Sequence, residues 1–153
     1  MDTLDAILGD IQDQADQDAH AYLGAKAYAL WRNPTHAGTF PRPDGVGDLT
    51  GSCGDSIQIE ILVTNECVRA ARFWTDGCGP SIVSGCAACI LAEGKTLEEA
   101  ASLQSKDIIH FLGGLPEDKE HCAHLAARTL QEAVGHCLRT QDACKRPQDP
   151  AST

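Results

Sequence analysis

The sequence predicts an α+β fold in which a small, roughly three-stranded antiparallel sheet packs against several helices, with long helices near both ends of the chain. Apolar residues at every second position from Ile57 to Val63 are typical of a strand with one buried face. Apolar residues recur every three or four positions over 5–31 and 117–140, as they do in amphipathic helices. The chain has 153 residues, 42% of them hydrophobic, which is enough for one domain with its own core.

The first third of the chain is expected to form a helix and then a loop. The helix over 5–31 should end at Asn33-Pro34, because the residue before a proline is disfavoured in the helical conformation. Glycine and proline recur through 34–54, which predicts a loop, and an edge strand over 46–50 fits within it.

A hairpin should follow this loop. In the strand over 56–64, the isoleucines and Val63 fall on one face, and Gln58 and Glu60 fall on the other. The second strand covers 67–75, after a turn at Asn65-Glu66. The hairpin therefore has one face for the core and one face for solvent.

The rest of the chain is predicted to be helical. Four helices are expected, over 81–93, 97–103, 107–112 and 117–140. Pro80 suits the first turn of the first of these, and Thr96 with Glu99 has the spacing of a capping box. Residues 145–153 are polar and contain proline, which predicts a disordered tail. Residues 1–144 are then expected to form a single domain.

Charge and composition exclude several classes of function. The formal net charge of -10 argues against a nucleic-acid-binding protein and against an anionic membrane surface, and it suits a basic protein partner. The N-terminal residues are acidic and lack the pattern of a signal peptide, and no apolar run approaches the roughly 20 residues of a membrane span. We therefore expect a cytoplasmic protein. In that reducing compartment, its eight cysteines indicate thiols or metal ligands rather than disulfides.

Three short motifs place metal-ligand residues at the ends of predicted elements. They are Cys53-Gly54-Asp55 before the hairpin, Gly77-Cys78-Gly79 after it, and His121-Cys122 early in the last helix. The glycines allow close approach of the backbone, and the start of a helix favours the thiolate form of Cys78 and Cys122. Thiolates with a carboxylate and an imidazole suit either zinc or an iron–sulfur cluster, and spacing alone does not distinguish the two.

These motifs, with Leu115-Pro116 and Lys119-Glu120 ahead of the third, resemble the signatures of IscU/NifU-type scaffolds for iron–sulfur cluster assembly, in the same order. The similarity spans roughly 31–137. It extends to Asn33-Pro34 with His36 and Gly38, to Ala71-Arg72-Phe73 and to Gly94-Lys95-Thr96. The Gly113-Gly114-Leu115-Pro116 run looks more like the NifU branch, without its later cluster-binding domains.

The resemblance implies a role for each motif residue. Cys53, Cys78 and Cys122 would hold a transient [2Fe–2S] cluster, or zinc in its absence. Asp55 would admit iron and keep the cluster labile, and His121 would be an accessory ligand. Cys122 would also accept persulfide sulfur from a cysteine desulfurase. The protein would then be a scaffold rather than an enzyme.

The resemblance also implies partners. These are a cysteine desulfurase, apo iron–sulfur proteins that receive the cluster and an electron-donating ferredoxin. The sequence leaves the oligomeric state open, a homodimer included. The dedicated Hsp70 chaperone of the bacterial branch is doubtful here, because Glu117 and Asp118 stand where its recognition motif has proline and valine.

Two other functions compete with the scaffold. A SufU-type protein would use zinc and relay sulfur, but that branch carries an insertion before the last ligand and lacks the histidine found here as His121. A Cys/His enzyme would need His121 to activate Cys122, and adjacent helical residues point about 100° apart. The remaining cysteines are interpreted as core or ordinary thiols: Cys67, Cys86, Cys89, Cys137 and Cys144.

Overall fold

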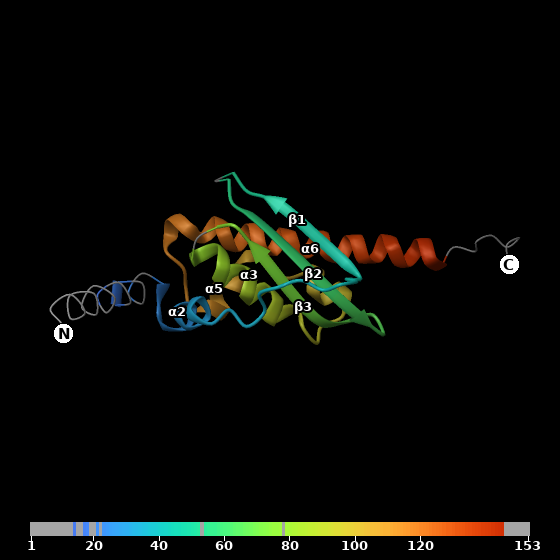
Figure 1. Cartoon of the computed structure of the whole chain (residues 1–153), viewed down its shortest axis with the longest axis horizontal. Helices are drawn as coiled ribbons and strands as arrows, with labels where there is room; N and C mark the ends of the chain where they lie inside the picture. Colours follow the sequence, from blue (N-terminus) through green and yellow to red (C-terminus); the bar gives the residue numbers. More distant parts are fainter. Residues whose placement is uncertain are drawn as a thin grey trace, which may run out of the picture.

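A three-stranded antiparallel sheet, covered on one face by helices, is the centre of the fold. The computed structural model describes residues 14, 17–18, 21, 23–52, 54–77 and 79–145, with side chains as far as residue 141. Strands β1 (Gly45–Thr50), β2 (Ser56–Thr64) and β3 (Cys67–Thr75) lie in the order β1-β2-β3. The helices are α2 (Ala25–Arg32), α3 (Gly79–Ala92), α4 (Leu97–Ala101), α5 (Ser105–Leu112) and α6 (Glu120–Lys145). The predicted α+β class and the three-stranded sheet are confirmed (Figure 1).

The hairpin has the predicted bounds. Ile57, Ile59 and Ile61 are fully buried, as the alternation indicates. A register shift between Leu62 and Val63 interrupts the alternation near the turn, and Val63 is only half-buried. Both turn residues have positive φ, 52° at Asn65 and 63° at Glu66, as a type I′ turn requires. The hairpin is therefore closed by its own turn chemistry.

Two glycines let β1 lie directly on α6. A Cβ atom on Gly45 would lie 2.3 Å from the carbonyl oxygen of Ala133, and one on Gly47 would lie 2.1 Å from that of Thr129. Real Cβ contacts are never this short, so any larger residue at either position would separate the strand from the helix. Helix α3 packs beside α6, beneath β3, and the two helices cover the same face of the sheet (Figure 1).

The opposite face of the sheet is partly covered by the segment after α2. Ala37 forms a parallel bridge with Phe73 at the free edge of β3. Glu60, expected on the solvent face, is 7% exposed because its carboxylate accepts hydrogen bonds from the backbone N–H of Phe40 (2.6 Å) and from Gln58 (2.7 Å). The prediction that Glu60 faces solvent is wrong, since the covering loop could not be located from the alternation.

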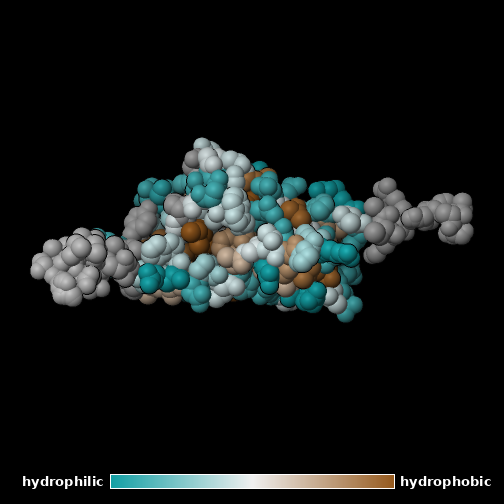
Figure 2. All heavy atoms as spheres, in the orientation of Figure 1, coloured by the Kyte–Doolittle hydropathy of each residue, from teal (hydrophilic) through white to brown (hydrophobic). Residues whose placement is uncertain are grey.

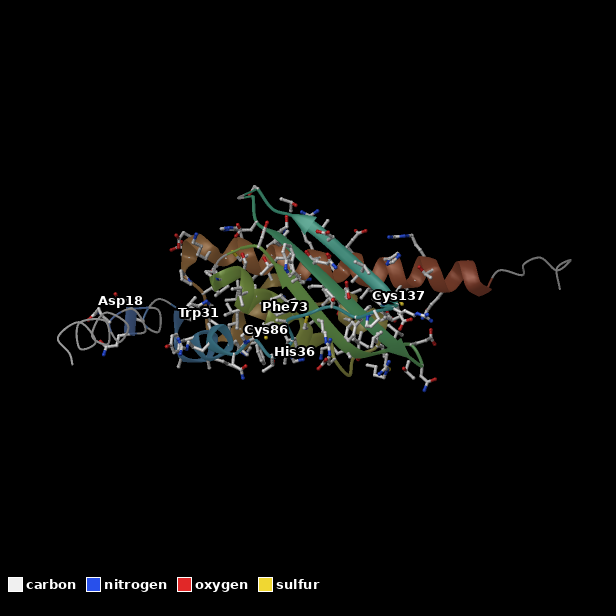
Figure 3. The ribbon with its side chains drawn as sticks, in the orientation of Figure 1. Asp18, Trp31, His36, Phe73, Cys86 and Cys137 are labelled. Carbon is white, nitrogen blue, oxygen red and sulfur yellow. The ribbon has the colours of Figure 1, made fainter. Side chains whose placement is uncertain are left out.

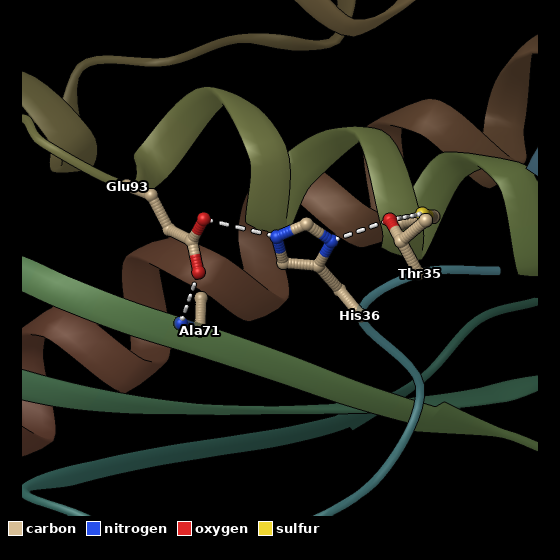
Figure 4. A network of polar contacts seen from close by, with 5 residues as sticks. Thr35, His36, Ala71 and Glu93 are labelled. Atoms are coloured by element: carbon tan, nitrogen blue, oxygen red, sulfur yellow. Dashed lines mark hydrogen bonds and ion pairs between the residues drawn. The ribbon is translucent and has the colours of Figure 1, made fainter.

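A histidine ties this covering segment to α3. His36 Nε2 lies 2.9 Å from Glu93 Oε1, and Glu93 Oε2 accepts a hydrogen bond from the backbone N–H of Ala71 (Figure 4). On its other side, His36 Nδ1 lies 2.7 Å from Thr35 Oγ1. His36 thus joins the loop, the end of α3 and the edge strand.

The first predicted helix is interrupted. Gly24 has φ +87°, and α2 begins only after it, at Ala25. The described residues before Gly24, among them Gln14 and Leu23, are helical, but residues 1–13 lie outside the described part of the chain. A continuous helix over 5–31 is therefore wrong at Gly24, where the backbone turns through a conformation that glycine adopts without strain.

The later helices differ from the prediction at their ends. Helix α4 ends at Ala101, two residues early, and α5 begins at Ser105, two residues early, because Gln104 and Asp107 form a capping box. The predicted start of the last helix is a short 3-10 turn over Glu117–Lys119, and α6 continues to Lys145. Residues 146–153 lie outside the described residues, so the disordered tail stays a prediction.

The face of the molecule shown in Figure 2 has no large apolar surface. Figure 2 shows hydrophobic residues in separate small patches among hydrophilic ones. Within the described part of the chain, no helix has the length and apolar character needed to cross a bilayer. Trp74 in β3 is a large hydrophobic residue with an exposed side chain (51%). Its partner in the ladder is Gln58, on the face of the sheet away from α3 and α6.

Candidate functional site

The loop between β1 and β2 places Asp55 beside the end of β3. The backbone N–H of Gly51 donates to the carbonyl oxygen of Asp55 (2.9 Å), and that of Gly54, with φ +94°, donates to Gly51 (3.0 Å). These two bonds fold the loop back on itself. Next to this loop, at the open end of the hairpin, Thr75 Oγ1 donates to the carbonyl oxygen of Ser56 (2.6 Å). The start of β2 and the exit of β3 are therefore fixed next to each other.

Asp55 lies against the backbone of Gly77. A Cβ atom on Gly77 would lie 2.6 Å from Asp55 Oδ2 and 2.7 Å from Ser81 Oγ, so no larger residue fits there. The expectation that the motif glycines permit close approach holds at Gly77. At Gly54 the requirement is conformational instead, because nothing lies within 4 Å of its Cβ position.

Ser81 joins two of the three motifs. Its hydroxyl is 2.9 Å from Asp55 Oδ2 and 3.5 Å from Cys122 Sγ, and the residue is completely buried. A hydroxyl has one proton, so Ser81 can donate to the carboxylate or to the sulfur at any moment. Sequence reasoning missed this residue. Its signal is a serine in the first turn of the helix that follows Cys78, where the side chain can reach back to neighbouring loops.

Cys122 lies in the first turn of α6 with its side chain buried (1% exposed). His121 is exposed, and its Nε2 is 3.7 Å from Cys122 Sγ. This contact corrects the geometric argument that neighbouring helical residues point too far apart to interact. The imidazole is long enough to bring its outer nitrogen back to the adjacent sulfur.

The contacts bring together residues from all three predicted motifs. Asp55 comes from the first, Gly77 from the second, and Cys122 and His121 from the third. Cys53 and Cys78 lie outside the described residues. No group of three or more histidine, cysteine, aspartate or glutamate side chains suited to a metal forms among those that are described.

The cysteines away from the motifs fall in two environments. Cys86 and Cys89 are completely buried in α3, which confirms their interpretation as core residues. Burial raises the pKa of the Cys89 thiol well above its ordinary value, and Cys86 and then Glu93 raise it further. Burial, followed by the charge of Asp44, also raises the pKa of Cys137. The raised pKa values of Cys89 and Cys137 disfavour the reactive thiolate form of these two residues.

Cys137 is far from the candidate site. Figure 3 shows it at the opposite end of the sheet from Trp31, whose ring lies against Gly79 at the start of α3. Cys67 is half-buried at the start of β3, and the side chain of Cys144 lies outside the described set. Within the described part of the chain, none of Cys67, Cys86, Cys89, Cys122 and Cys137 forms a disulfide.

Comparison with known proteins gives a consistent match. The NifU-like N terminal domain family matches residues 23–143. The chain is 36% identical over 110 residues to the iron–sulfur cluster assembly scaffold protein IscU 1 of Archaeoglobus fulgidus, covering 71% of this chain and 72% of that protein. It is 37% identical over 115 residues to the nitrogen fixation protein NifU of Azotobacter chroococcum mcd 1, covering 71% of this chain and 37% of NifU.

The fold is also similar to a solved structure. FiSufU, a protein for the SUF system of Fervidobacterium islandicum AW-1, superposes with a TM-score of 0.60 over 75% of this chain and 98% of its own. The two sequences are 19% identical, so this likeness concerns the fold alone.

Proposed function

The chain belongs to the NifU-like N-terminal domain family, and from this premise we propose that it is a scaffold on which iron–sulfur clusters are assembled and then released. Its cargo is a [2Fe–2S] cluster bound by Cys53, Cys78 and Cys122. Three thiolates suit such a cluster, because soft sulfur ligands favour iron–sulfur chemistry. The same three thiolates would bind zinc when no cluster is present.

One observation carries this assignment. Ser81 contacts both Asp55 and Cys122, and Asp55 packs against Gly77. Asp55 is two residues from Cys53, and Gly77 is the neighbour of Cys78, so the described chain brings the flanks of both cysteines to Cys122. Three unrelated core thiols would give no reason for this convergence.

Cys122 is proposed to receive the sulfur. Its thiolate attacks the outer sulfur of a persulfide on a cysteine desulfurase, the sulfur–sulfur bond of that persulfide breaks, and the desulfurase cysteine leaves as a thiolate. The exchange needs no external oxidant or reductant. Two electrons are then required to convert the transferred sulfur to sulfide, and an electron-donating protein of the ferredoxin class supplies them.

Asp55 and His121 are proposed to tune the bound cluster. A carboxylate is a poorer partner for the cluster than a fourth thiolate, so Asp55 lets the cluster form and leave. His121 is an accessory ligand or donor beside Cys122, in keeping with the 3.7 Å contact. The protein would act as a carrier rather than an enzyme, in the cytoplasm, and pass its cluster to apo iron–sulfur proteins.

The ligand assignment is tested by single substitutions. Cys53→Ser, Cys78→Ser and Cys122→Ser should each abolish a stable cluster after anaerobic reconstitution, because a hydroxyl is a hard, poor ligand for iron–sulfur clusters. Visible absorption and the iron and sulfide content report the cluster, and circular dichroism reports the fold. A variant whose cluster is unaltered in yield and spectrum removes that cysteine from the site.

A matched control uses two cysteines of the core. Replacing Cys86 and Cys89 together by alanine should leave the cluster yield nearly unchanged, since both are buried in α3 and assigned to packing. Loss of the cluster without loss of folding would give these thiols a role that the proposal does not include. The alternative, a SufU-type sulfur relay, predicts a colourless zinc protein that accepts persulfide in the same experiment.

A further inference from the structure

A small groove lies beside the candidate site, between the loop after β1 and one face of α6. Its volume is about 230 Å³, and its lining includes Thr50, Gly51 and Ser52 from the loop and His121, His124 and Arg128 from the helix. The three helical residues are spaced by three and four positions, so they follow each other along one face of α6. Leu49 and Leu125 complete the lining with apolar side chains.

The charge of the groove is opposite to that of the molecule. The chain has 12 lysines and arginines against 22 aspartates and glutamates, yet none of the described residues that line this groove carries a carboxylate. Two other pockets formed by described residues each contain acidic side chains, Asp44 and Glu66 in one and Glu66 and Glu98 in the other. The lining of this groove therefore differs in charge from the linings of those two pockets.

Arg128 is available to a ligand. It forms no hydrogen bond or ion pair with the residues that the structure describes, and the same is true of His124. Arg139, on the same helix, is instead 3.5 Å from Glu132. A guanidinium presents a planar fork of N–H donors that matches a carboxylate or phosphate group. His124 adds a ring nitrogen, and Ser52 adds a hydroxyl at the opposite rim.

We propose that this groove binds the oxyanion of a small ligand, a carboxylate or a phosphate group, held by Arg128 with His124 and Ser52. Its volume is below the roughly 300–1,000 Å³ of pockets that enclose drug-sized ligands, so the occupant is small or inserts only one group. The apolar part of the lining favours a ligand with a short carbon skeleton. Because His121 also borders the candidate site, a ligand here lies next to the cargo that the proposed function assigns to Cys122.

The test is a titration of the full, metal-free chain with citrate and, separately, with inorganic phosphate at constant ionic strength. Backbone amide shifts are followed by NMR, and those of Gly51, His124 and Arg128 should move together and saturate. Arg128→Gln should weaken binding by about tenfold, the value expected when a charged hydrogen-bonding partner is removed. Arg139→Gln removes the same charge from the same helix outside the groove and should leave the affinity unchanged.

The two titrations distinguish a carboxylate site from a phosphate site. Saturation with citrate alone identifies a carboxylate site, saturation with phosphate alone identifies a phosphate site, and both support the groove. No saturable shift at these residues, or equal weakening by Arg128→Gln and Arg139→Gln, overturns the proposal. If Arg128→Gln is poorly folded, the chemical-shift changes of the unaltered protein still decide whether the groove binds the ligand. The titration uses metal-free protein, so its outcome does not depend on whether the chain binds a cluster in reconstitution. The scaffold proposal and the oxyanion-groove proposal can therefore fail independently.

Discussion

Replacing Ser81 by alanine tests the contacts that join the first motif, through Asp55, to the third motif, through Cys122. Ser81 is completely buried, and its hydroxyl is 2.9 Å from the Asp55 carboxylate and 3.5 Å from the Cys122 sulfur. The substitution removes that hydroxyl and changes little volume. The metal-free protein is the right sample, because any loss of stability then reports the hydrogen bond rather than a missing cargo.

The expected loss follows from the partner's charge. A hydrogen bond to a charged group contributes about 1.5–3 kcal/mol, and Asp55 is only half-buried, so the lower end applies. For a chain of this size, each kcal/mol shifts the melting temperature by about 2–4 °C, so a loss of about 1.5 kcal/mol lowers it by about 3–6 °C. In the Asp55→Ala background, most of this loss should vanish, because the two residues act as a pair.

The same helix offers a matched control. Ser84 is also completely buried, but its hydroxyl has no hydrogen-bond partner among the described residues. Ser84→Ala should therefore leave the free energy of unfolding unchanged or raise it by up to about 1 kcal/mol, since an unpaired buried hydroxyl is costly. Urea denaturation measures both variants. Equal effects of Ser81→Ala and Ser84→Ala, or no effect of the first, would refute the reasoning.

Three further predictions concern packing, pH and lability. Gly47→Ala should destabilise the protein by about 3 kcal/mol or more in urea denaturation, because its Cβ would lie 2.1 Å from a carbonyl oxygen of α6. Gly135→Ala is the control, because a Cβ atom at this position in α6 would lie 3.3 Å from the flexible side chain of Arg139. This substitution should be neutral or stabilising. A loss of stability equal to that of Gly47→Ala would contradict the packing argument. A buried thiol with a raised pKa contributes stability that is complete below its ordinary pKa of 9.0 and declines as the pH rises beyond it. The free energy of unfolding should therefore fall above about pH 9, and it should fall less steeply in Cys89→Ala. Identical pH dependence in the two proteins would exclude Cys89 as the cause. Asp55→Ala should lengthen the lifetime of a reconstituted cluster in air, followed by visible absorption, whereas faster loss than in the unaltered protein would contradict the labilising role.

The sheet was predictable because its signals are local. The alternation over 56–64 fixes which face of β2 is buried, and Asn65-Glu66 fixes the turn. The missed boundaries also have local causes that sequence signals express weakly. Gly24 breaks the first helix, although glycine within a helical pattern is often tolerated. Gln104 caps α5, although glutamine is not a preferred capping residue.

Long-range contacts were the part that pattern analysis could not supply. The burial of Glu60 depends on a loop about 20 residues earlier, and the contact of Ser81 with Asp55 and Cys122 joins three separate segments. The three motifs were found because their residue types are unusual at the ends of elements. The signal of Ser81, a serine in the first turn of the helix after Cys78, is weak, since serine early in a helix is ordinary.

Anaerobic reconstitution with iron, cysteine and a cysteine desulfurase, followed by addition of an apo-ferredoxin, tests the central claim most directly. The scaffold account predicts that a coloured cluster with equal amounts of iron and sulfide forms on the protein and then moves to the ferredoxin. A colourless, zinc-loaded protein that accepts persulfide but never builds a cluster would contradict it.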